Sequence, residues 1–339
     1  MVAYPLISVI ILNYNGKGFL EECIDSVLKS DYPNFEVILV DNASSDDSIG
    51  VIEKAFVQDN RLKIIRNNQN LMFTGGNNVG ILQAKGELII VLNNDTVVEK
   101  NWLKEISKAM QDERIAASQP KMLIYGSSPP ILDYTVNTMD RYGFCNGIGR
   151  GTIDRGQYDG TDEIFYAAGA ALVLRKKVLD EVGIFDEKFG AHWEDVDLCW
   201  RIRLKGYKIC FIPKAVVYHK GSLTMTRFAK KNAVSWYVRK NRIAGLIKNY
   251  NTANLIMNLP VLLLIQFLLF LWELVCAKDT ALAISSPMAI LSNIRNLRHL
   301  LKERRRIQKH VRKVSDKNIS VFFTKRPVFL EFLNRTLKG

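Results

Sequence analysis

The chain has few of the features that mark secreted, disulfide-bonded or metal-finger proteins. Its 339 residues include five cysteines, with no Cys-x-x-Cys pair and no even set for a disulfide framework. This usage is typical of a reducing compartment. Residues 1–5 lack a basic stretch followed by an apolar core and a small-residue cleavage site, so no signal peptide is predicted. We therefore expect the N-terminal part of the protein to stay in the cytoplasm.

Two other absences narrow the function. Gly75, Gly76 and Gly80 do not have the Gly-x-Gly-x-x-Gly spacing of dinucleotide-binding folds, which disfavours an NAD enzyme. The chain also lacks long apolar runs, apart from residues 255–277. Its length allows one large α/β domain with an appendage, or two modest domains.

The first hundred residues alternate between short apolar runs and helical patterns. Four runs rich in β-branched residues predict strands, at residues 6–12, 35–40, 62–65 and 88–92. Apolar residues at helical spacing predict a helix over 19–28, and a second helix follows Gly75-Gly76. Strands separated by helices predict an α/β fold with a mainly parallel sheet flanked by helices.

Polar residues follow the predicted strands at their carboxyl ends. Asn13, Asp41, Asn70 and Asp95 all lie at or just after such ends. Ligands of open α/β sheets bind at this edge, so we expect these side chains to surround a ligand site.

The remaining segments divide the chain into two predicted regions. Residues 121–162 are expected to form an irregular insertion, 164–174 a strand or turn with small residues, 194–204 a helix, 207–218 a strand and 228–250 a basic helix. We predict a catalytic domain over residues 1–250. Residues 251–339 are expected to form a helical, membrane-associating region.

Asn93-Asn94-Asp95 is a candidate metal site. A carboxylate at a strand end can hold Mg²⁺ or Mn²⁺ while two phosphates occupy other positions on the ion. His219, one of only four histidines, is a candidate second ligand. The alternatives are an ordinary turn, which Asn and Asp favour, and a packed histidine.

Glu194-Asp195-Val196-Asp197 opens a predicted helix. Acidic residues in a first turn suit the helix dipole, and this role alone would explain them. A carboxylate held at a helix start by backbone amides is also well placed as a general base. Transfer of a group to a hydroxyl needs such a base, because an alcohol is a poor nucleophile until its proton is removed.

The C-terminal region joins an apolar segment to a basic one. As a helix, residues 255–277 would be about 35 Å long, enough to cross a bilayer. A buried core helix is the alternative, because Gln266 and Glu273 interrupt the segment. Residues 295–313 hold nine Lys or Arg against one Glu, a net charge of +8.

Positive flanks on both sides disfavour a single crossing, since one flank would lie outside. We therefore expect shallow or hairpin insertion, with residues 280–294 as the return arm. The basic segment is expected to contact anionic lipids. A solvated helix face is the alternative, and no nucleic-acid partner is expected beside an apolar segment.

Taken together, these motifs resemble the family 2 glycosyltransferases of GT-A fold, and within them the rhamnosyltransferase-like branch. The resemblance covers about residues 5–250. The motifs that carry it are Ser8 to Asn15, Val40 to Ser44, Asn70 to Asn78, Asn93 to Asp95, Glu194 to Asp197, and Tyr218-His219.

The resemblance implies an inverting transferase that uses a nucleoside diphosphate sugar and a divalent metal, Mn²⁺ or Mg²⁺. Asp195 would be the catalytic base, and Asp95 and His219 would hold the metal. The substrate-binding residues would be Asn13, Tyr14, Asp41, Asn42, Asn70, Gly76, Asn77, Asn78, Asn93, Trp193, Glu194 and Arg242. Among these, Asp41 would bind the pyrimidine base.

The expected reaction adds a sugar to a polyprenyl-diphosphate-linked glycan at the cytoplasmic face of the membrane, during assembly of a cell-surface polysaccharide. Thymidine diphosphate-rhamnose is the expected donor. Uridine diphosphate sugars, including galactofuranose, remain alternatives. A sugar nucleotidyltransferase and a membrane-anchored binding module are the rival functions; the first would release pyrophosphate, and the second would not need Asp95 and Asp195.

Overall fold

The centre of the protein is an eight-stranded sheet. The computed structural model describes residues 4–221 and 231–328, and its sheet has the order β3-β2-β1-β4-β9-β6-β10-β5. Its strands are β1 (Ile7–Asn13), β2 (Phe35–Asp41), β3 (Leu62–Arg66), β4 (Leu88–Asn93), β5 (Thr96–Val98), β6 (Ile115–Ile124), β9 (Ala171–Arg175) and β10 (Lys208–His219). Neighbours β3, β2, β1 and β4 are parallel, as are β6 and β10, whereas β9 and the edge strand β5 run antiparallel to their neighbours.

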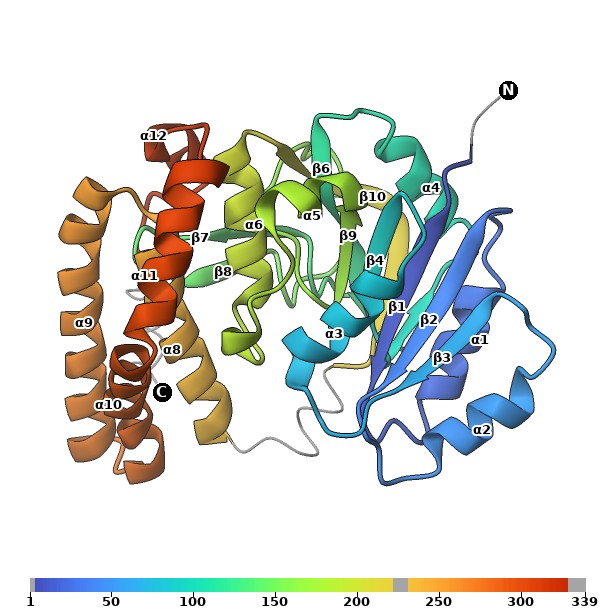
Figure 1. The fold of residues 1–339 in the computed structure, drawn as a ribbon, viewed down its shortest axis with the longest axis horizontal. Coiled ribbons are helices and arrows are strands. Elements are labelled where there is room, and N and C mark those ends of the chain that lie inside the picture. Colours follow the sequence, from blue (N-terminus) through green and yellow to red (C-terminus); the bar gives the residue numbers. More distant parts are fainter. Residues whose placement is uncertain (1–3, 222–230, 329–339) are drawn as a thin grey trace.

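Helices cover both faces of this sheet (Figure 1). One face carries α1 (Leu20–Leu28), α2 (Ser48–Ala55) and α4 (Trp102–Ala109), and the other carries α3 (Met72–Gln83), α5 (Lys176–Val182) and α6 (Glu194–Lys205). Strand β1 shows why two layers form. Its Val9 and Ile11 pack on the α1 side and its Ile10 on the α3 side, because successive side chains of a strand point to opposite faces. The predicted α/β fold, a mainly parallel sheet flanked by helices, is confirmed.

Pairing in the sheet brings the polar strand ends together. Asn13 is in register with Asp41, and Leu12 with Asn93. His219, the last residue of β10, pairs with Thr96 just after Asp95. The loops that follow these strands therefore meet along one edge.

Glycines let α3 lie close to the sheet. A Cβ atom on Gly80 would lie 2.4 Å from Cγ2 of Ile10, and one on Gly76 would lie 2.4 Å from Cδ1 of Leu12. Gly76 therefore has a packing role against β1.

The middle of the chain is more ordered than its sequence predicted. Within the expected irregular insertion, β7 (Val136–Met139) and β8 (Cys145–Ile148) form a separate antiparallel pair, and β6 extends to Ile124. The prediction was wrong there because four-residue strands leave too short a pattern to recognise. Of the predicted strand or turn at 164–174, the first part is irregular and ends in a turn at Ala168–Ala171, and β9 follows.

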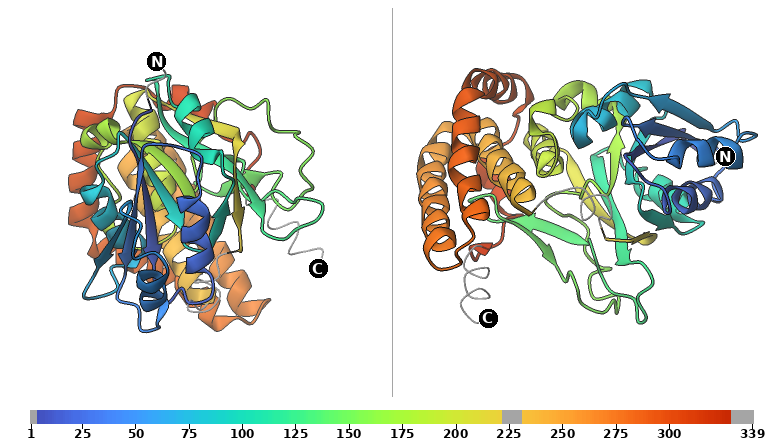
Figure 2. Two further views of the ribbon diagram at one scale, coloured as in Figure 1. Left: turned by 90° about the vertical axis from the view of Figure 1, so that its right-hand side faces the viewer. Right: turned by 90° about the horizontal axis from the view of Figure 1, so that it is seen from below.

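The C-terminal helices form a third layer beside α6 (Figures 1 and 2). They are α8 (Lys231–Asn249), α9 (Thr252–Val275), α10 (Thr280–Arg295) and α11 (Leu297–Arg306), followed by a π-helical turn at Ile307–Val311 and by α12 (Asp316–Ser320). The start predicted for the basic helix, at residue 228, lies outside the described residues. Side-chain caps from Asn251 and Asp279 begin α9 and α10, and α10 lies beside both α8 and α9.

Substituting Gly80→Val should destabilise the protein by about 1–3 kcal/mol, because the new side chain overlaps Ile10 in a packed layer. Chemical denaturation measures the free energy of unfolding. Gly160→Val is the matched control, since a Cβ atom there meets nothing within 4 Å. Equal stability of the two variants would contradict the close packing of α3.

Candidate active site

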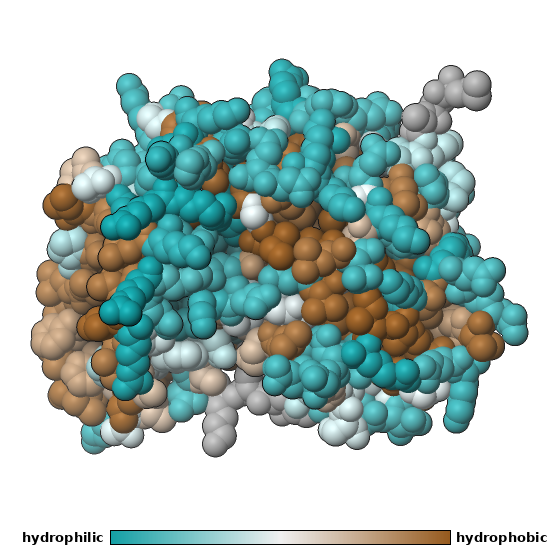
Figure 3. Space-filling view, in the orientation of Figure 1, coloured by the Kyte–Doolittle hydropathy of each residue, from teal (hydrophilic) through white to brown (hydrophobic). Residues whose placement is uncertain are grey.

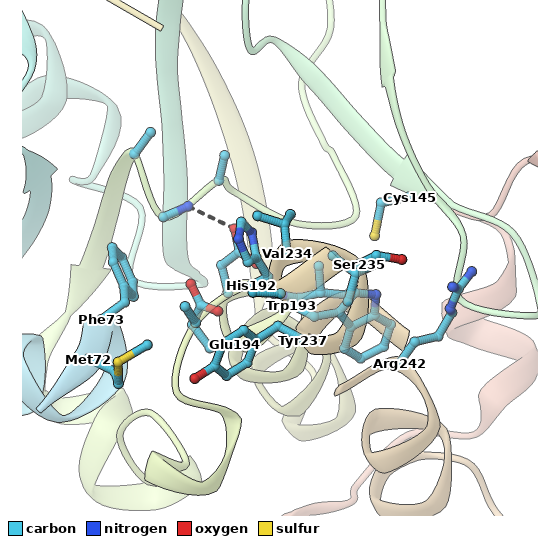
Figure 4. Close-up of a pocket in the computed structure, with 18 of the residues that line it drawn as sticks. Met72, Phe73, Cys145, His192, Trp193, Glu194, Val234, Ser235, Tyr237 and Arg242 are labelled. Carbon is cyan, nitrogen blue, oxygen red and sulfur yellow. Dashed lines mark hydrogen bonds between the residues drawn. The ribbon is translucent and has the colours of Figure 1, made fainter. Parts of the chain in front are cut away.

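A cavity lies where the strand ends, the start of α6 and helix α8 meet. Its wall is made by residues after β1, β2 and β4, by the turn at 168–170, by residues 191–196, and by α8. Figure 4 shows its lower wall, with Met72 and Phe73 on one side and Arg242 on the other. The cavity therefore opens at the sheet edge where a ligand site was expected.

Most of the predicted site residues line this cavity. They are Tyr14, Asn42, Asn70, Asn93, Asp95, Trp193, Glu194, Asp195, His219 and Arg242. The structure does not bring Asn13, Asp41, Gly76, Asn77 and Asn78 into its wall.

Residues outside the wall support the loops that form it. Asn13 donates hydrogen bonds to the hydroxyls of Ser44 and Ser48 and accepts one from Asn94, at 2.9–3.1 Å. Asn78 donates to the backbone oxygen of Phe185 at 3.0 Å, which ties α3 to the segment before α6. These contacts position neighbouring loops.

His219 lies between two carboxylates. Its Nδ1 is 2.6 Å from Asp133, and its Nε2 is 3.4 Å from Asp95. Burial disfavours the imidazolium, but hydrogen bonds to Asp133 and Asp95 outweigh it and raise the pKa of His219 to about 9. Asp133 also accepts a hydrogen bond from Arg150, so its position is fixed from both sides.

Asp95 and His219 fit a divalent metal as a partial ligand set. Among the residues that the structure describes, no group of three or more His, Cys, Asp or Glu side chains surrounds one point. A carboxylate and an imidazole nitrogen 3.4 Å apart leave most coordination positions to a ligand such as a diphosphate. Asp133 at Nδ1 gives the carboxylate–histidine arrangement that orients a metal-binding imidazole.

The three acids at the start of α6 have different surroundings. Asp197 is paired with Lys248 and Arg201, each at 3.1 Å; despite burial, these cations lower its pKa. Burial raises the pKa of Asp195, whose carboxylate accepts backbone N–H bonds from Gly169 and Val196, each at 2.8 Å. Asp197 is therefore structural, while Asp195 faces the cavity as a carboxylate held by amides.

The turn before α6 is strained and is held by α8. His192 and Trp193 have φ angles of 63° and 71°, which lie in a backbone region that residues other than glycine rarely adopt. The side-chain amide of Asn241 donates to the backbone oxygens of Phe189, Ala191 and His192, at 2.6–3.0 Å. Helix α8 thus sets the position of the acids that follow the turn.

Trp193 and Arg242 complete the far wall. Gly245 makes room for the indole ring, since a Cβ atom there would lie 1.9 Å from it, and the indole N–H donates to Gly143 at 3.1 Å. Arg242 stacks on the ring of Phe144, and burial lowers its pKa to about 10. Its Nε has no hydrogen-bond partner among the described residues. The wall therefore offers a buried cation to an anionic ligand.

Sequence reasoning missed several residues that shape the site. Asp133 lies in the segment expected to be irregular, and no spacing relates it to His219. Asn94 was part of the quoted motif but not of the predicted site, although it lines the cavity. Gly169 was a usable signal, because the small residues of segment 164–174 allow a ligand to approach the backbone closely.

Comparison with known proteins places the chain in a family. The sequence matches glycosyl transferase family 2 over residues 8–183, more than half of its length, so the chain belongs to this family. It is 27% identical to the O-antigen biosynthesis protein RfbC of Myxococcus xanthus, over 64% of this chain and 18% of that protein. It is 31% identical to the glucosyltransferase WfaP of Escherichia coli, described as UDP-Glc:alpha-D-GlcNAc-diphosphoundecaprenol beta-1,3-glucosyltransferase, over 38% of this chain and 54% of that protein.

A solved structure shares the fold. GalNAc-T7 with UDP, GalNAc and Mn²⁺ superimposes with a TM-score of 0.61 at 18% identity, over 74% of this chain and 49% of that one. The chain spans only 18–36% of the length of the first three curated relatives.

Asn241→Ala should lower turnover by up to about 100-fold, because the turn carrying the acids loses the donor that holds it. Stability should fall by about 1–3 kcal/mol, the cost of leaving buried carbonyls without this partner. Sugar transfer and thermal unfolding are the measurements. Asn101→Ala is the control, since Asn101 makes no side-chain cap bond at α4. Normal turnover in Asn241→Ala would show that the turn holds its shape unaided.

Proposed function

We propose that the protein is a metal-dependent inverting glycosyltransferase acting on a nucleoside diphosphate sugar. An acceptor hydroxyl attacks the anomeric carbon, the bond to the diphosphate oxygen breaks, and the nucleoside diphosphate leaves with the electron pair. The acceptor proton passes to Asp195. The surroundings of the Asp195 carboxylate support this proposal most directly. The carboxylate lines the cavity, has no cationic partner among the described residues, and is held by two backbone N–H groups. A base needs this geometry.

Asp95 and His219 would hold Mn²⁺ or Mg²⁺ against the donor diphosphate. When bound, such an ion stabilises negative charge on the leaving group. Asp133 would keep Nε2 of His219 facing Asp95 through its bond to Nδ1. The Mn²⁺ in the GalNAc-T7 structure supports this proposal.

The donor site would use the other strand ends. Asn42 binds Asn70 at 2.8 Å, which orders the loop between β3 and α3 beside the cavity. Asp41 lies outside the cavity wall but next to Asn42, which lines it, and would bind the base as the family resemblance implies; Arg242 would contact the diphosphate or the acceptor. Thymidine diphosphate-rhamnose is the donor that the family resemblance predicts, and the name of WfaP supports a uridine diphosphate sugar.

The acceptor would be a polyprenyl-diphosphate-linked glycan, as the name of WfaP suggests for that enzyme. Helix α9 supports a membrane location because its polar residues face inward: Glu273 forms a buried ion pair with Arg239, and Gln266 and Asn258 are buried. Among the described residues, α9 is the one helix long and apolar enough to cross a bilayer. Its outward face is apolar, and brown residues gather there in Figure 3.

This arrangement supports a helical pair lying on the membrane with its outer face in lipid. Large apolar residues exposed on α9 and α10 include Ile256, Met257, Leu264, Phe267, Leu268, Ile284, Met288 and Leu291. The basic residues of segment 295–313 fall into two groups, those that contact the protein and those that are exposed. Arg304 and Arg312 bind backbone oxygens of the protein, whereas Arg298, Lys302 and Arg305 are exposed and could meet anionic headgroups at the cytoplasmic face.

Asp195→Asn should leave donor and metal affinity unchanged and lower turnover by roughly 100-fold or more, the scale of losing a positioned proton acceptor. Product analysis should show a free nucleoside diphosphate in the wild type. Release of pyrophosphate would instead identify a nucleotidyltransferase. Near-normal transfer by Asp195→Asn would remove it from the role of base.

Asp95→Ala and His219→Ala should both weaken Mn²⁺-dependent binding of a nucleoside diphosphate, because each removes one of the two proposed ligands. Calorimetric titration of Mn²⁺ with uridine or thymidine diphosphate measures this without catalysis. The exposed Asp25→Ala serves as control. Unchanged metal dependence in both site variants would place the metal elsewhere.

Leu264→Ser with Leu268→Ser should weaken binding to anionic vesicles, since both side chains are more than half exposed on the outer face of α9. The exposed Leu82→Ser on α3 is the matched control. Charge reversal at Arg298 and Lys302 should weaken binding mainly at low salt, because that contact is screened. Vesicle binding unaffected by any of these changes would contradict a membrane face on α9.

A further inference from the structure

One buried acid in the cavity has no partner that would keep it charged. Glu194 is the first residue of α6 and is 6% exposed, and its Oε2 has no hydrogen-bond partner among the described residues. Figure 4 shows its carboxyl between Phe73 of α3 and Tyr237 of α8, in the cavity wall.

Asp195 and Asp197, on the same helix, have partners that Glu194 lacks in the described part of the chain. Asp195 receives two backbone N–H bonds, and Asp197 receives two cations and the amide of Asn249. Among the described residues Glu194 has no cationic partner, and the backbone N–H that offsets part of its burial is its own. A buried carboxylate with so little support is costly, and the neutral acid is then the stable form.

The surrounding groups act in the same direction. Burial and the adjacent charge of Asp195 raise the pKa of Glu194 well above its ordinary value. His192, in the preceding turn, is itself buried, which lowers its pKa and keeps it neutral. Tyr237 faces Glu194 from α8 as a neutral phenol, and the cavity-lining residues of α3 and of the turn at 168–170 are uncharged: Met72, Phe73, two alanines and Gly169.

The nearby arginines that the structure describes do not compensate a charge on Glu194. Arg239 is paired with Glu273 on α9, and Arg242 lies over Phe144 at the other side of the wall. Two adjacent carboxyl groups in such different settings take different roles: the one with amide donors stays ionised, and the other holds the proton.

We propose that Glu194 donates a hydrogen bond to a hydroxyl group of the bound sugar, next to Asp195, which accepts the proton of the reaction. This proposal rests on the proposed glycosyltransferase function. A neutral carboxylic acid has one O–H donor and an acceptor oxygen, and a sugar hydroxyl can pair with both. No proton is transferred from Glu194; it binds the sugar and leaves one carboxylate in the pair free to act as base.

Two substitutions at this position, with one control elsewhere, separate the possibilities. Glu194→Gln keeps an uncharged donor of nearly the same size and should keep turnover within about tenfold of wild type. Glu194→Leu keeps volume but removes the donor, and should lose about 10- to 100-fold in kcat/KM. The exposed Glu113→Gln is the control, with a side chain 77% exposed. Thermal unfolding and binding of uridine or thymidine diphosphate, which contain no sugar, show that each variant is folded.

The pH profile gives a readout that a packing role would not change. In the wild type, ionisation of Glu194 at alkaline pH removes the donor and adds charge beside Asp195, so kcat/KM should fall there. Glu194→Gln cannot ionise and should lose this alkaline decline. Glu194→Gln as inactive as Asp195→Asn would mean that the charged form is needed, and full activity in Glu194→Leu would mean that no hydroxyl is bound; either result overturns the proposal.

Binding and kinetic measurements show whether the hydroxyl that Glu194 contacts belongs to the donor or to the acceptor. If it belongs to the donor, Glu194→Leu binds UDP-glucose or TDP-rhamnose more weakly while its affinity for the free nucleoside diphosphate is unchanged. If it belongs to the acceptor, donor hydrolysis is unchanged and the acceptor KM rises. Failure of the proposed function is distinguishable, because the wild type would then transfer no sugar from any donor, whatever residue stands at 194.

Discussion

A buried polar network at Lys248 is the contact on which the site depends. Lys248 on α8 binds Asp197 of α6 at 3.1 Å and Asp186 of the preceding loop at 2.7 Å; the side chains of Lys248 and Asp197 are each 1% exposed and that of Asp186 is 8% exposed. His299 on α11 also contacts Asp186. Removing one member of such a network leaves buried charge unpaired, which costs several kcal/mol. The network therefore holds the start of α6, and with it Asp195, in one position relative to α8.

Helix α8 connects this network to two other parts of the molecule. Two turns earlier, Asn241 holds the strained turn before α6, and near the middle of α8 Arg239 pairs with Glu273 of α9. The catalytic wall and the apolar helices are thus attached to the same rigid element. This connection gives a physical reason for the proposed membrane face to lie beside the cavity: the proposed acceptor with a lipid tail would reach Asp195, the proposed base, while the outer face of α9 stays in the bilayer.

Local pattern was sufficient for much of the fold. The first four strands follow from their apolar runs, and α1 and α3 follow from helical spacing and from Gly75-Gly76; the strand-end polar residues meet as parallel pairing requires. The short strands β7 and β8, the antiparallel β9 and the helices α4 and α5 did not follow, because their patterns are brief or because their direction depends on the neighbouring strand. Asp133 was beyond prediction for the same reason: its partner His219 is distant in the chain and adjacent only in the sheet.

The sequence alone determined the residue types at the site and the family, because Asp95, the acids from Glu194 and His219 occur in a recognisable order around predicted strand ends. The sequence could not show which role each of the three acids, Glu194, Asp195 and Asp197, has. Tertiary structure decided that Asp197 pairs with Lys248, that Asp195 is held by backbone amides, and that Glu194 is buried with no cation beside it among the described residues. It also decided that Gln266 and Glu273 of α9 face protein. The physical reason is that charge state depends on the local surroundings of a side chain, which only the packed chain supplies.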